Sequence, residues 1–572
     1  MDGWRSELRQ FSILTRHFFG RLFRNDMVDF EDQMKEKLIV ALSLLAVFFS
    51  WASWLLLFKY HFVADINRSW QEKNYIFTLM MLVFAVITLL EWDVLFPDRR
   101  DFLNLAPLPV RLRTMFAAKL ASFVLFIGLF SAAMMSVSSV LFSMYLTDWR
   151  AKSLVLAVRY VFSHLAAGFA AAFAVFFSVV FLQFLMMALL PGALYRKSAM
   201  AARFALTVGL IFVLLSFAVA PASLGRSFHD LGSLKDAGDP FMFRFPPLWF
   251  VGLYEVLLGT RDAVFEAEAR TAGLALVLAL AAFIGSGVLS YRRHVRKTLE
   301  VRKARPPFPG LRRGWGKVLA ATLLRTPEER AVYGFFSDTL RASPQHRMTL
   351  VYYLASGSAG ILVLVAAYRE AFRTLSPASG FLLVLPLLLA FTIVAGVRVL
   401  VDRPASLEAN WVFRLSETRR TARYASGLKK ALVLRFLVPL FLGVLAVHAM
   451  LWDFATALNH ASFGLTVSVL GVEAAFTHYR KIPFACSWVP GKLKLHFTIF
   501  PCLIGLLLSM TVLAAIERSV LADPSRALIF YAFSAMVGLS LWLENARFYR
   551  RSPSLFYDEA PEAALIELPS GD

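Results

Sequence analysis

Residue patterns that carry catalytic chemistry are scarce in this 572-residue chain. The stretch Gly310–Val318 contains glycines and a lysine, but it lacks the spacing and the final hydroxyl of a phosphate-binding G-x-x-x-x-G-K-[ST] loop. The ten histidines are scattered, with no H-E-x-x-H pair and no Cys/His cluster that would predict a metal site. No G-x-S-x-G nucleophile elbow occurs. We therefore expect a protein that is not an enzyme and binds no metal or cofactor directly.

Charged residues inside apolar runs are the next candidates, because such charges are expensive in lipid and usually functional. Lys119, Arg159, Arg435 and Glu473 all fall near the ends of apolar runs, where long side chains can reach the interface. His164 is interpreted as a hydrogen-bonding residue between helices. The runs contain no central acid of the kind that a proton- or sodium-coupled carrier uses. We therefore expect any energy source for transport to lie in another chain.

Composition identifies the class of protein. The chain is 58% hydrophobic and only 17% charged, whereas soluble proteins contain about 25% charged residues. Apolar runs recur at close to the roughly 20 residues that cross a bilayer, and no period-2 barrel pattern appears. These features predict an all-α polytopic transmembrane helix bundle of about 12 spans in two groups of six. The expected spans are 37–58, 75–91, 114–146, 158–189, 204–221 and 269–290, followed by 349–368, 381–397, 431–451, 459–477, 495–515 and 527–543.

Basic residues predict the orientation of the bundle. The segment between the two groups is crowded with them and is expected to stay inside, which places both termini in the cytoplasm. Its basic residues are Arg292, Arg293, Arg296, Lys297, Arg302, Lys303, Arg305, Arg312, Arg313 and Lys317. In a membrane protein a net charge of +21 indicates orientation and anionic lipid rather than nucleic acid. No cleavable signal is expected in the N-terminal region, and Cys486 and Cys502 are not expected to form a disulfide.

The expected domains follow from these elements. An amphipathic arm begins the chain, with Trp4, Leu8, Phe11, Leu14, Phe18 and Leu22 at helical spacing, and is expected to lie in the interface. The alternative is a helix packed on a neighbour. A second interfacial helix is expected from Thr326 to Ser343, with a capping threonine and Pro327 in its first turn. The domains are the arm 1–36, the first six-helix half 37–291, the basic linker with its interfacial helix 292–348, the second half 349–545 and a cytoplasmic tail 546–572.

Two charged cytoplasmic loops are the candidate contacts with a partner. The first, Phe96–Arg111, is a proline-broken segment after the second span, and the second spans 402–417. Both follow the second span of their half, and both contain an Asp-Arg pair. In the second loop, helical spacing places Leu407, Trp411 and Leu415 on one face, which suits docking in a groove. The alternative is a loop helix packed under its own bundle or lying on lipid. The candidate docking residues are Asp98, Arg99, Leu103, Leu105, Asp402, Arg403, Leu407, Trp411, Arg414 and Leu415.

The long external segment, 222–268, contains an apolar stretch that is too short to cross a bilayer. This stretch, Phe245–Gly259, is long enough to dip into the membrane or lie flat on it. Trp249 and Tyr254 are typical interface residues. Together with Pro247 they are candidates for an external gate. A helix that simply caps the bundle is an equal alternative.

The first loop and its surroundings resemble a known family. Leu105-Ala106-Pro107-Leu108-Pro109-Val110-Arg111, followed by Ala117-Ala118-Lys119-Leu120, is similar to the leucine-proline-valine run and lysine of ABC transporter permeases of the type-2 exporter class. The interfacial helix before the first span and the apolar segment before the sixth also match. The second half departs from the family. Its last two spans are joined by only Glu517 to Arg526, and its proline-rich loop Lys481–Lys492 has no counterpart.

The resemblance implies two unlike permease halves fused in one chain, in a bacterial cytoplasmic (inner) membrane. It implies two copies of an ATP-binding cassette ATPase as partners, so that ATP acts through those subunits and the chain binds none. The loops 98–111 and 402–417 would dock in the ATPases. The leucines and Trp411 would form the apolar contact. Asp98, Arg99, Asp402 and Arg403 would fix the register of the two proteins by charge. Membrane lipid and a transported substrate of unknown identity are the other partners. Export as the direction is implied by the class alone.

Two other classes of protein remain open. A 12-helix secondary carrier resembling the major facilitator class shares the six-plus-six layout, and Asp98-Arg99-Arg100 is similar to its charged loop. Against it stand the missing glycines of that signature and the absence of a buried acid for coupling. A membrane enzyme acting on lipid is the third class, but no paired catalytic residues support it.

Overall fold

The computed structural model is all-helical over the residues it describes, with no strand among them. It divides into two compact units, Met1–Lys303 and Ala304–Asp572, and each is considered by itself. The boundary between them lies in the basic segment that follows the first group of apolar helices. The described residues are 2–23, 31–58, 69–90, 92, 110–146, 154–219, 235, 241–299, 322–368, 380–405, 410–415, 417–418, 420–485, 495–551 and 554–555.

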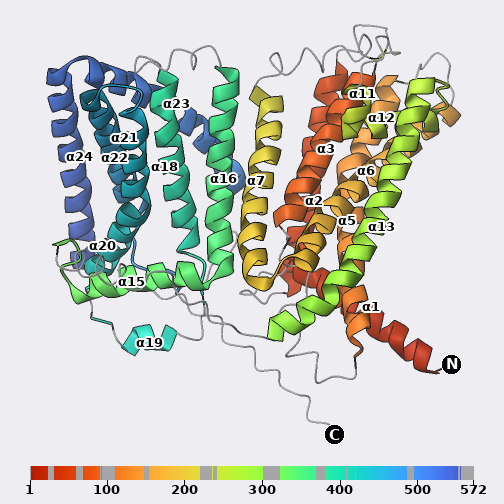
Figure 1. Cartoon of the computed structure of the whole chain (residues 1–572), viewed down its shortest axis with the longest axis horizontal. Coiled ribbons are helices and arrows are strands. Elements are labelled where there is room, and N and C mark those ends of the chain that lie inside the picture. Colours follow the sequence, from red (N-terminus) through yellow and green to blue (C-terminus); the bar gives the residue numbers. More distant parts are fainter. Residues whose placement is uncertain are drawn as a thin grey trace. The chain divides into compact units, whose positions relative to one another are not determined.

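Unit 1 begins with an amphipathic helix and continues with long apolar helices (Figure 1). α5 and α6, at 35 and 36 residues, exceed the roughly 20 residues that a bilayer requires, as their sequences predict. The short helix α12 packs against α3, α6 and α13. The elements of unit 1 are α1 (Asp2–Phe23), α2 (Glu31–Leu57), α3 (Trp70–Leu90), α5 (Leu112–Leu146), α6 (Leu154–Leu189), α7 (Gly192–Val219), α11 (Phe241–Arg244), α12 (Pro246–Leu258) and α13 (Ala263–Leu299).

Unit 2 repeats this order: an amphipathic helix, two long helices, a loop, and four further helical segments. In Figure 1, α15 runs across the ends of α16 and α18. The elements of unit 2 are α15 (Pro327–Ala342), α16 (Pro344–Ala367), α18 (Gly380–Leu400), α19 (Asn410–Leu415), α20 (Thr421–Leu432), η3 (Val433–Leu437), α21 (Val438–His448), α22 (Phe454–Ala475), α23 (Leu495–Ala522) and α24 (Pro524–Arg551).

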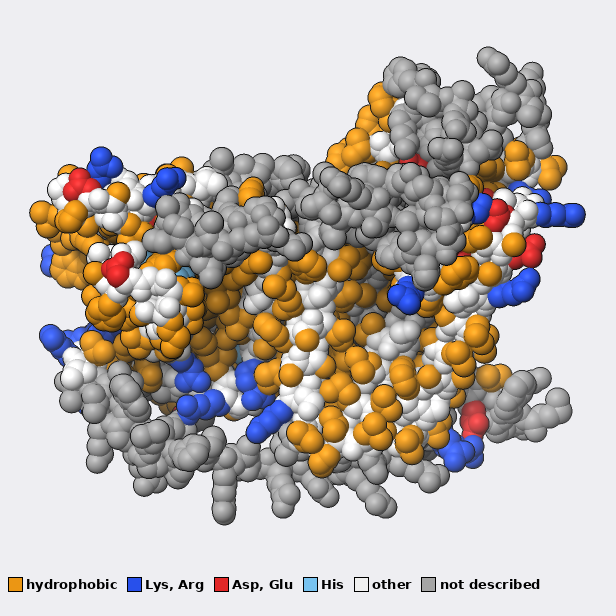
Figure 2. Space-filling view, turned by 45° about the horizontal axis from the view of Figure 1, so that its top comes forward, with side chains coloured by type: hydrophobic (Ala, Val, Ile, Leu, Met, Phe, Trp, Pro, Cys, Tyr) orange, Lys and Arg blue, Asp and Glu red, His pale blue; other side chains and the backbone are white. Residues whose placement is uncertain are grey.

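Ten helices of the described chain are long and apolar enough to cross a membrane. They coincide with ten of the twelve expected runs, and the other two runs fall on α2 and α23. Figure 2 shows hydrophobic side chains covering the flanks of the helices, with lysine and arginine gathered near helix ends. On α24 the side chains of Leu528, Phe533 and Trp542 are each more than half exposed. Exposed apolar flanks of this extent are expected where lipid is the solvent. The chain is a helical, polytopic membrane protein.

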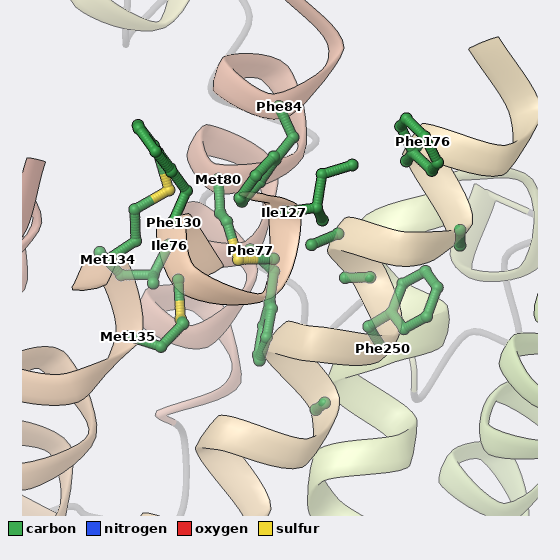
Figure 3. Close-up of a cluster of buried hydrophobic side chains, with 14 of the residues drawn as sticks. Ile76, Phe77, Met80, Phe84, Ile127, Phe130, Met134, Met135, Phe176 and Phe250 are labelled. Atoms are coloured by element: carbon green, nitrogen blue, oxygen red, sulfur yellow. The ribbon is translucent and has the colours of Figure 1, made fainter. Parts of the chain in front are cut away.

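The core of unit 1 is built from aromatic and methionine side chains at helical spacing. Figure 3 shows Phe77, Met80 and Phe84 of α3 meeting Phe130 and other side chains of α5. Gly168 of α6 lets Met135 approach, because a Cβ at that position would lie 2.9 Å from the methionine Cγ. This packing positions α3, α5 and α6 around the polar groups described below.

The N-terminal arm packs on its neighbour rather than lying free in the interface. Leu14 and Phe18 of α1 are buried against Met115 and Ala118 of α5. Lys119 of α5 places its ammonium 5.4 Å from the centre of the Phe18 ring. Leu8 remains 48% exposed. The structure therefore favours the alternative of a packed helix for this face of the arm.

Helix α15 begins and ends where its sequence predicts. The Thr326 hydroxyl accepts a hydrogen bond from the Glu329 amide, and the Glu329 carboxylate accepts one from the Thr326 amide, which completes a capping box. Pro327 occupies the first turn, and Ser343 ends the helix. Local sequence is sufficient to place this helix.

The segment predicted as the ninth span begins ten residues earlier than expected. α20, η3 and α21 form one continuous helix from Thr421 to His448. Its five-residue π-helical turn precedes Pro439, whose ring nitrogen cannot donate to the preceding turn. The expectation missed α20 because this part is amphipathic and carries Lys429 and Lys430.

Candidate functional site

The second charged loop lies on a platform at one end of unit 2. We define this α15–α19 platform as α15, α19, the start of α20 at Thr421–Lys430, and residues 482–485. In Figure 1, α19 lies on the side of α15 that faces away from α16 and α18. The Phe413 ring of α19 contacts the Phe335 ring of α15 with 5.2 Å between centroids. Ile482, Ala485 and Leu555 complete this small apolar cluster.

Helix α19 is short and exposes apolar side chains. Leu415 is 80% exposed and Val412 is 46% exposed, whereas Phe413 points into the cluster. Trp411 and Arg414 lie in α19, and Leu407 lies outside the described residues. Helix α19 is thus held by its own chain through Phe413, while Leu415 stays exposed.

The Asp-Arg pair of this loop is engaged within the chain. The Asp402 carboxylate accepts a 2.5 Å hydrogen bond from Arg398 on α18. The Arg403 guanidinium donates to the Thr349 hydroxyl at 3.0 Å, and its carbonyl lies 2.9 Å from His346 Nε2. These contacts tie the loop to α16 and α18. They give the pair a local role beside the predicted one of fixing the register of a partner.

Phe484 is a platform residue that sequence reasoning missed. It is 1% exposed and has φ 64°, the left-handed region that non-glycine residues rarely adopt. Its amide donates to the Val401 carbonyl and its carbonyl accepts from the Ala405 amide, so it pairs with the start of the second charged loop. Its ring stacks on Phe336 at 5.5 Å. The proline-rich loop that had no counterpart in the resemblance therefore supports the 402–417 loop.

The other predicted docking residues belong to the first loop. Asp98, Arg99, Leu103 and Leu105 lie outside the described residues, as does Cys486. The structure therefore describes most of the second loop, at 402–405, 410–415 and 417, and of the first loop only residues 110 and 111. Arg111, at the end of the first, forms an ion pair with Glu7 of α1.

Two glutamates at the start of α15 join it to α20. Glu328 lies 3.5 Å from both Arg420 and Arg423. Glu329 accepts hydrogen bonds from Lys430 at 2.6 Å and from Ser426 at 2.7 Å. Hydrogen bonding at its own backbone amide is the main cause that lowers the pKa of Glu328, and the two arginines add to it. Burial alone would raise the pKa of Glu329, but Lys430 and Ser426 outweigh it and the pKa falls below its ordinary value.

These shifts predict that unit 2 loses stability in acid. A carboxylate whose pKa is lower in the folded state stabilises the fold above the unfolded value, which is about 4.3 for glutamate. That contribution disappears as pH falls through the lowered folded values. The unfolding temperature, followed from pH 7 downward, is expected to decline below about pH 4.5. Glu329→Gln should flatten this decline, and an equally steep curve in the variant would contradict the assignment.

Helix α12 of unit 1 is held by a buried ion pair that sequence reasoning also missed. Lys73 of α3 and Glu255 of α12 are 1% and 4% exposed, and the lysine Nζ bonds to Glu255 Oε1. Thr260 donates to the other carboxylate oxygen at 2.8 Å. The lysine ammonium also lies 4.5 Å from the centre of the Tyr254 ring and 5.7 Å from that of Tyr160. The aromatic faces and the carboxylate together satisfy the buried cation.

The three candidate gate residues occupy different environments. Pro247 is buried at the start of α12, and Tyr254 is fully buried beside Lys73. The Trp249 indole donates to the Phe243 carbonyl at 2.8 Å. Arg159 of α6 donates to the Leu257 carbonyl at the end of α12, next to Gly259 with φ 92°. In this conformation α12 is attached to three neighbouring helices, an arrangement that suits a cap.

Acidic residues are buried near the ends of two helices, and the expectation that the chain has no buried acid was wrong. Glu268 of α13 is 0% exposed, and neither carboxylate oxygen has a partner among the described residues. Glu517 of α23 is also 0% exposed and lies 2.5 Å from His460 of α22. Glu268 lies one residue before the predicted sixth span. Glu517 was assigned to a connecting loop, but α23 continues to Ala522. Both acids were missed because the expected spans were shorter than the helices that carry them.

Of the four charges near the ends of apolar runs, Lys119 and Arg159 have the contacts described above, and Arg435 lies in η3. Glu473 of α22 accepts a 2.6 Å hydrogen bond from Lys429 of α20. His164 lies 3.1 Å from the Ser138 hydroxyl, which in turn lies 2.8 Å from that of Ser53, as expected for a residue that bonds between helices. Among the described residues no group of histidine, cysteine and acidic side chains could hold a metal ion.

Comparison with known proteins identifies no relative. No protein-family model matches the chain, and neither the curated proteins nor the solved structures contain a match. The functional argument therefore rests on the residues and geometry above.

Proposed function

We propose that the chain is the permease subunit of an ATP-driven exporter, coupled to two ATP-binding cassette ATPases through the loops 98–111 and 402–417. The single observation that carries the proposal is α19, a short helix held by Phe413 that leaves Leu415 80% exposed. The repeated order of amphipathic helix, two long helices and loop supports two docking points of the same kind. The proposal includes twelve spans, cytoplasmic termini and a bacterial inner membrane.

The mechanism follows from how the platform is attached. A partner that moves α19 acts on α15 through Phe413 and Phe335, and α15 is joined to α20 by Glu328 and Glu329. Because α20 continues into η3 and α21, a displacement of the platform is passed to a long apolar helix. ATP binding and hydrolysis in the partner would thus move helices as rigid bodies.

Removal of Trp411 or Leu415 should weaken the complex with the ATPase. A buried hot-spot side chain contributes about 2 kcal/mol or more, which is roughly 30-fold in affinity. The measurement is ATP hydrolysis and ATPase protein recovered with the tagged full chain, for wild type, Trp411→Ala and Leu415→Ala. Met450→Ala, which removes a side chain that is 86% exposed outside the platform, is the control and should not change recovery. Undiminished recovery in both platform variants would count against docking at α19.

A secondary carrier resembling the major facilitator class is the second candidate. The observation that favours it is the set of buried charged residues, Lys73–Glu255, Glu268 and His460–Glu517, because buried acids are the groups that couple a carrier to ions. The secondary-carrier function predicts that the chain purifies without an ATPase. Recovery of the intact tagged chain with no associated ATP hydrolysis would favour the carrier and contradict the exporter.

A further inference from the structure

His460 and Glu517 of unit 2 form a contact that requires a proton. His460 Nδ1 and Glu517 Oε1 are 2.5 Å apart, and the side chains are 1% and 0% exposed. Two lone pairs cannot approach so closely, so a hydrogen must lie between the atoms. His460 Nε2 and Glu517 Oε2 are buried and have no partner among the described residues. The pair therefore uses one atom of each side chain in its mutual hydrogen bond, and the other atom of each has no hydrogen bond.

Two protonation states keep the short hydrogen bond. In the first, Glu517 is a carboxylate, His460 Nδ1–H donates to it, and Nε2 carries a lone pair, so the net charge is −1. In the second, one proton has been added at Nε2, and imidazolium with carboxylate makes the pair neutral overall. Both protons then belong to the pair rather than to either residue. Addition of a proton at Nε2 removes a net charge from a buried site, which favours binding.

The surroundings present few competing charges. His448 of α21 lies with its ring centre 4.8 Å from that of His460, and it donates from Nδ1 to the Val444 carbonyl at 3.0 Å. From α24, Tyr531 is a titratable side chain that interacts with Glu517, whereas α18 contributes the apolar Leu387. Arg435 of η3 precedes His448 by 13 residues, about 20 Å along the helix. Further charged groups at this end of the unit are Asp453, Arg518 and the ion pair of Asp523 with Arg526.

We propose that His460 and Glu517 form a site in unit 2 that binds one proton at His460 Nε2. His460 lies seven residues into α22 from Asp453, about 10 Å along its axis, and Glu517 lies five residues before the end of α23. The site is thus close to the end of the unit where α21 connects to α22, so that end is the shorter way for a proton to reach it. This inference holds whether ATP or an ion gradient drives transport.

Trp452 supplies a reporter for the site. Its indole stacks on His448 with 4.4 Å between centroids and lies 5.5 Å from His460. Protonated imidazole quenches indole fluorescence more strongly than neutral imidazole does. The full chain in lipid nanodiscs is titrated with acid, and the signal of Trp452 is taken as the difference between wild type and Trp452→Phe. We expect a single quenching step on acidification, at a pH set by the coupled pair rather than by an isolated histidine.

Variants separate the site from its neighbours. His460→Gln keeps a donor to Glu517 but cannot take up the proton, and it should abolish the step. Glu517→Gln leaves an imidazolium without a counter-charge, so the step should move at least one pH unit toward acid, a tenfold loss in proton affinity. His448→Gln should retain the step, as should His478→Gln, whose ring lies on Phe548 and is 43% exposed at the side chain.

Two outcomes would overturn the proposal. One is a flat titration of the wild-type difference signal, which needs no variant of the pair to fold. The other is a step that survives in His460→Gln and disappears in His448→Gln, because the stacked His448 ring would then be the group that titrates.

Discussion

Replacement of Lys73 by methionine is expected to destabilise unit 1 by about 3–5 kcal/mol, because it leaves a carboxylate buried without its cation. Glu255 is 4% exposed, and without the lysine its side-chain partner among the described residues is the Thr260 hydroxyl. The methionine fills most of the lysine volume, so the loss is electrostatic rather than a cavity. We expect α12 to loosen from α3, since this buried ion pair joins the two helices.

Unfolding of the detergent-solubilised full chain, followed by denaturant and by heat, measures this loss. The double variant Lys73→Met/Glu255→Gln is expected to recover most of it, because a neutral amide can keep the Thr260 bond without a buried charge. Arg270→Gln is the matched control: it breaks an ion pair of α13 whose side chains are 80% and 46% exposed. Such a pair contributes about 0.5 kcal/mol or less. A double variant as unstable as Lys73→Met would contradict the electrostatic explanation.

Replacement of Gly427 by valine is expected to separate α15 from α20 and to cost about 1–3 kcal/mol through overpacking. A Cβ at Gly427 would lie 2.9 Å from the Glu329 Cα and 3.0 Å from its carbonyl oxygen. These are backbone atoms, so the helices themselves must move apart. The displacement would strain the hydrogen bonds from Lys430 and Ser426 to Glu329.

Hydrogen exchange of the α15 amides, together with global unfolding, tests this expectation. Faster exchange in α15 of Gly427→Val is the predicted result. Gly334→Ala is the control on α15 itself, because a Cβ there meets nothing within 4 Å. Alanine in a helix interior is favoured over glycine by about 0.5–1 kcal/mol, so this variant should be neutral or slightly stabilising. Unchanged exchange in Gly427→Val would show that α15 and α20 are not held as described.

The two predictions concern different proposals. Lys73 and Glu255 decide whether α12 is a fixed cap or a movable gate, since a helix that must open cannot depend on a bond whose loss unfolds the unit. The Gly427→Val experiment tests whether α15 and α20 move together. The exporter mechanism requires that they do. A platform that tolerates valine would not pass a partner's motion to the long helix.

Structural features that depend on residues close together in the sequence were predictable. The apolar runs indicated long helices and an all-α class, because backbone groups in lipid must be satisfied within the helix. The boundaries of α15 followed from Thr326, Pro327 and Glu329, whose side chains and backbones cap one another within a single turn. These elements use contacts a few residues apart, and such contacts are visible in sequence.

Sequence by itself thus determined a helical polytopic membrane protein and the position of the charged loop at 402–417. Only the tertiary structure brought Lys73 to Glu255, 182 residues apart, and His460 to Glu517, 57 residues apart. The same is true of Phe484, which supports the loop from a distant segment. The reason is physical: a buried ion pair leaves no periodic pattern in either helix, and each partner alone resembles an ordinary interfacial charge. The pairing exists only once packing has removed both groups from solvent.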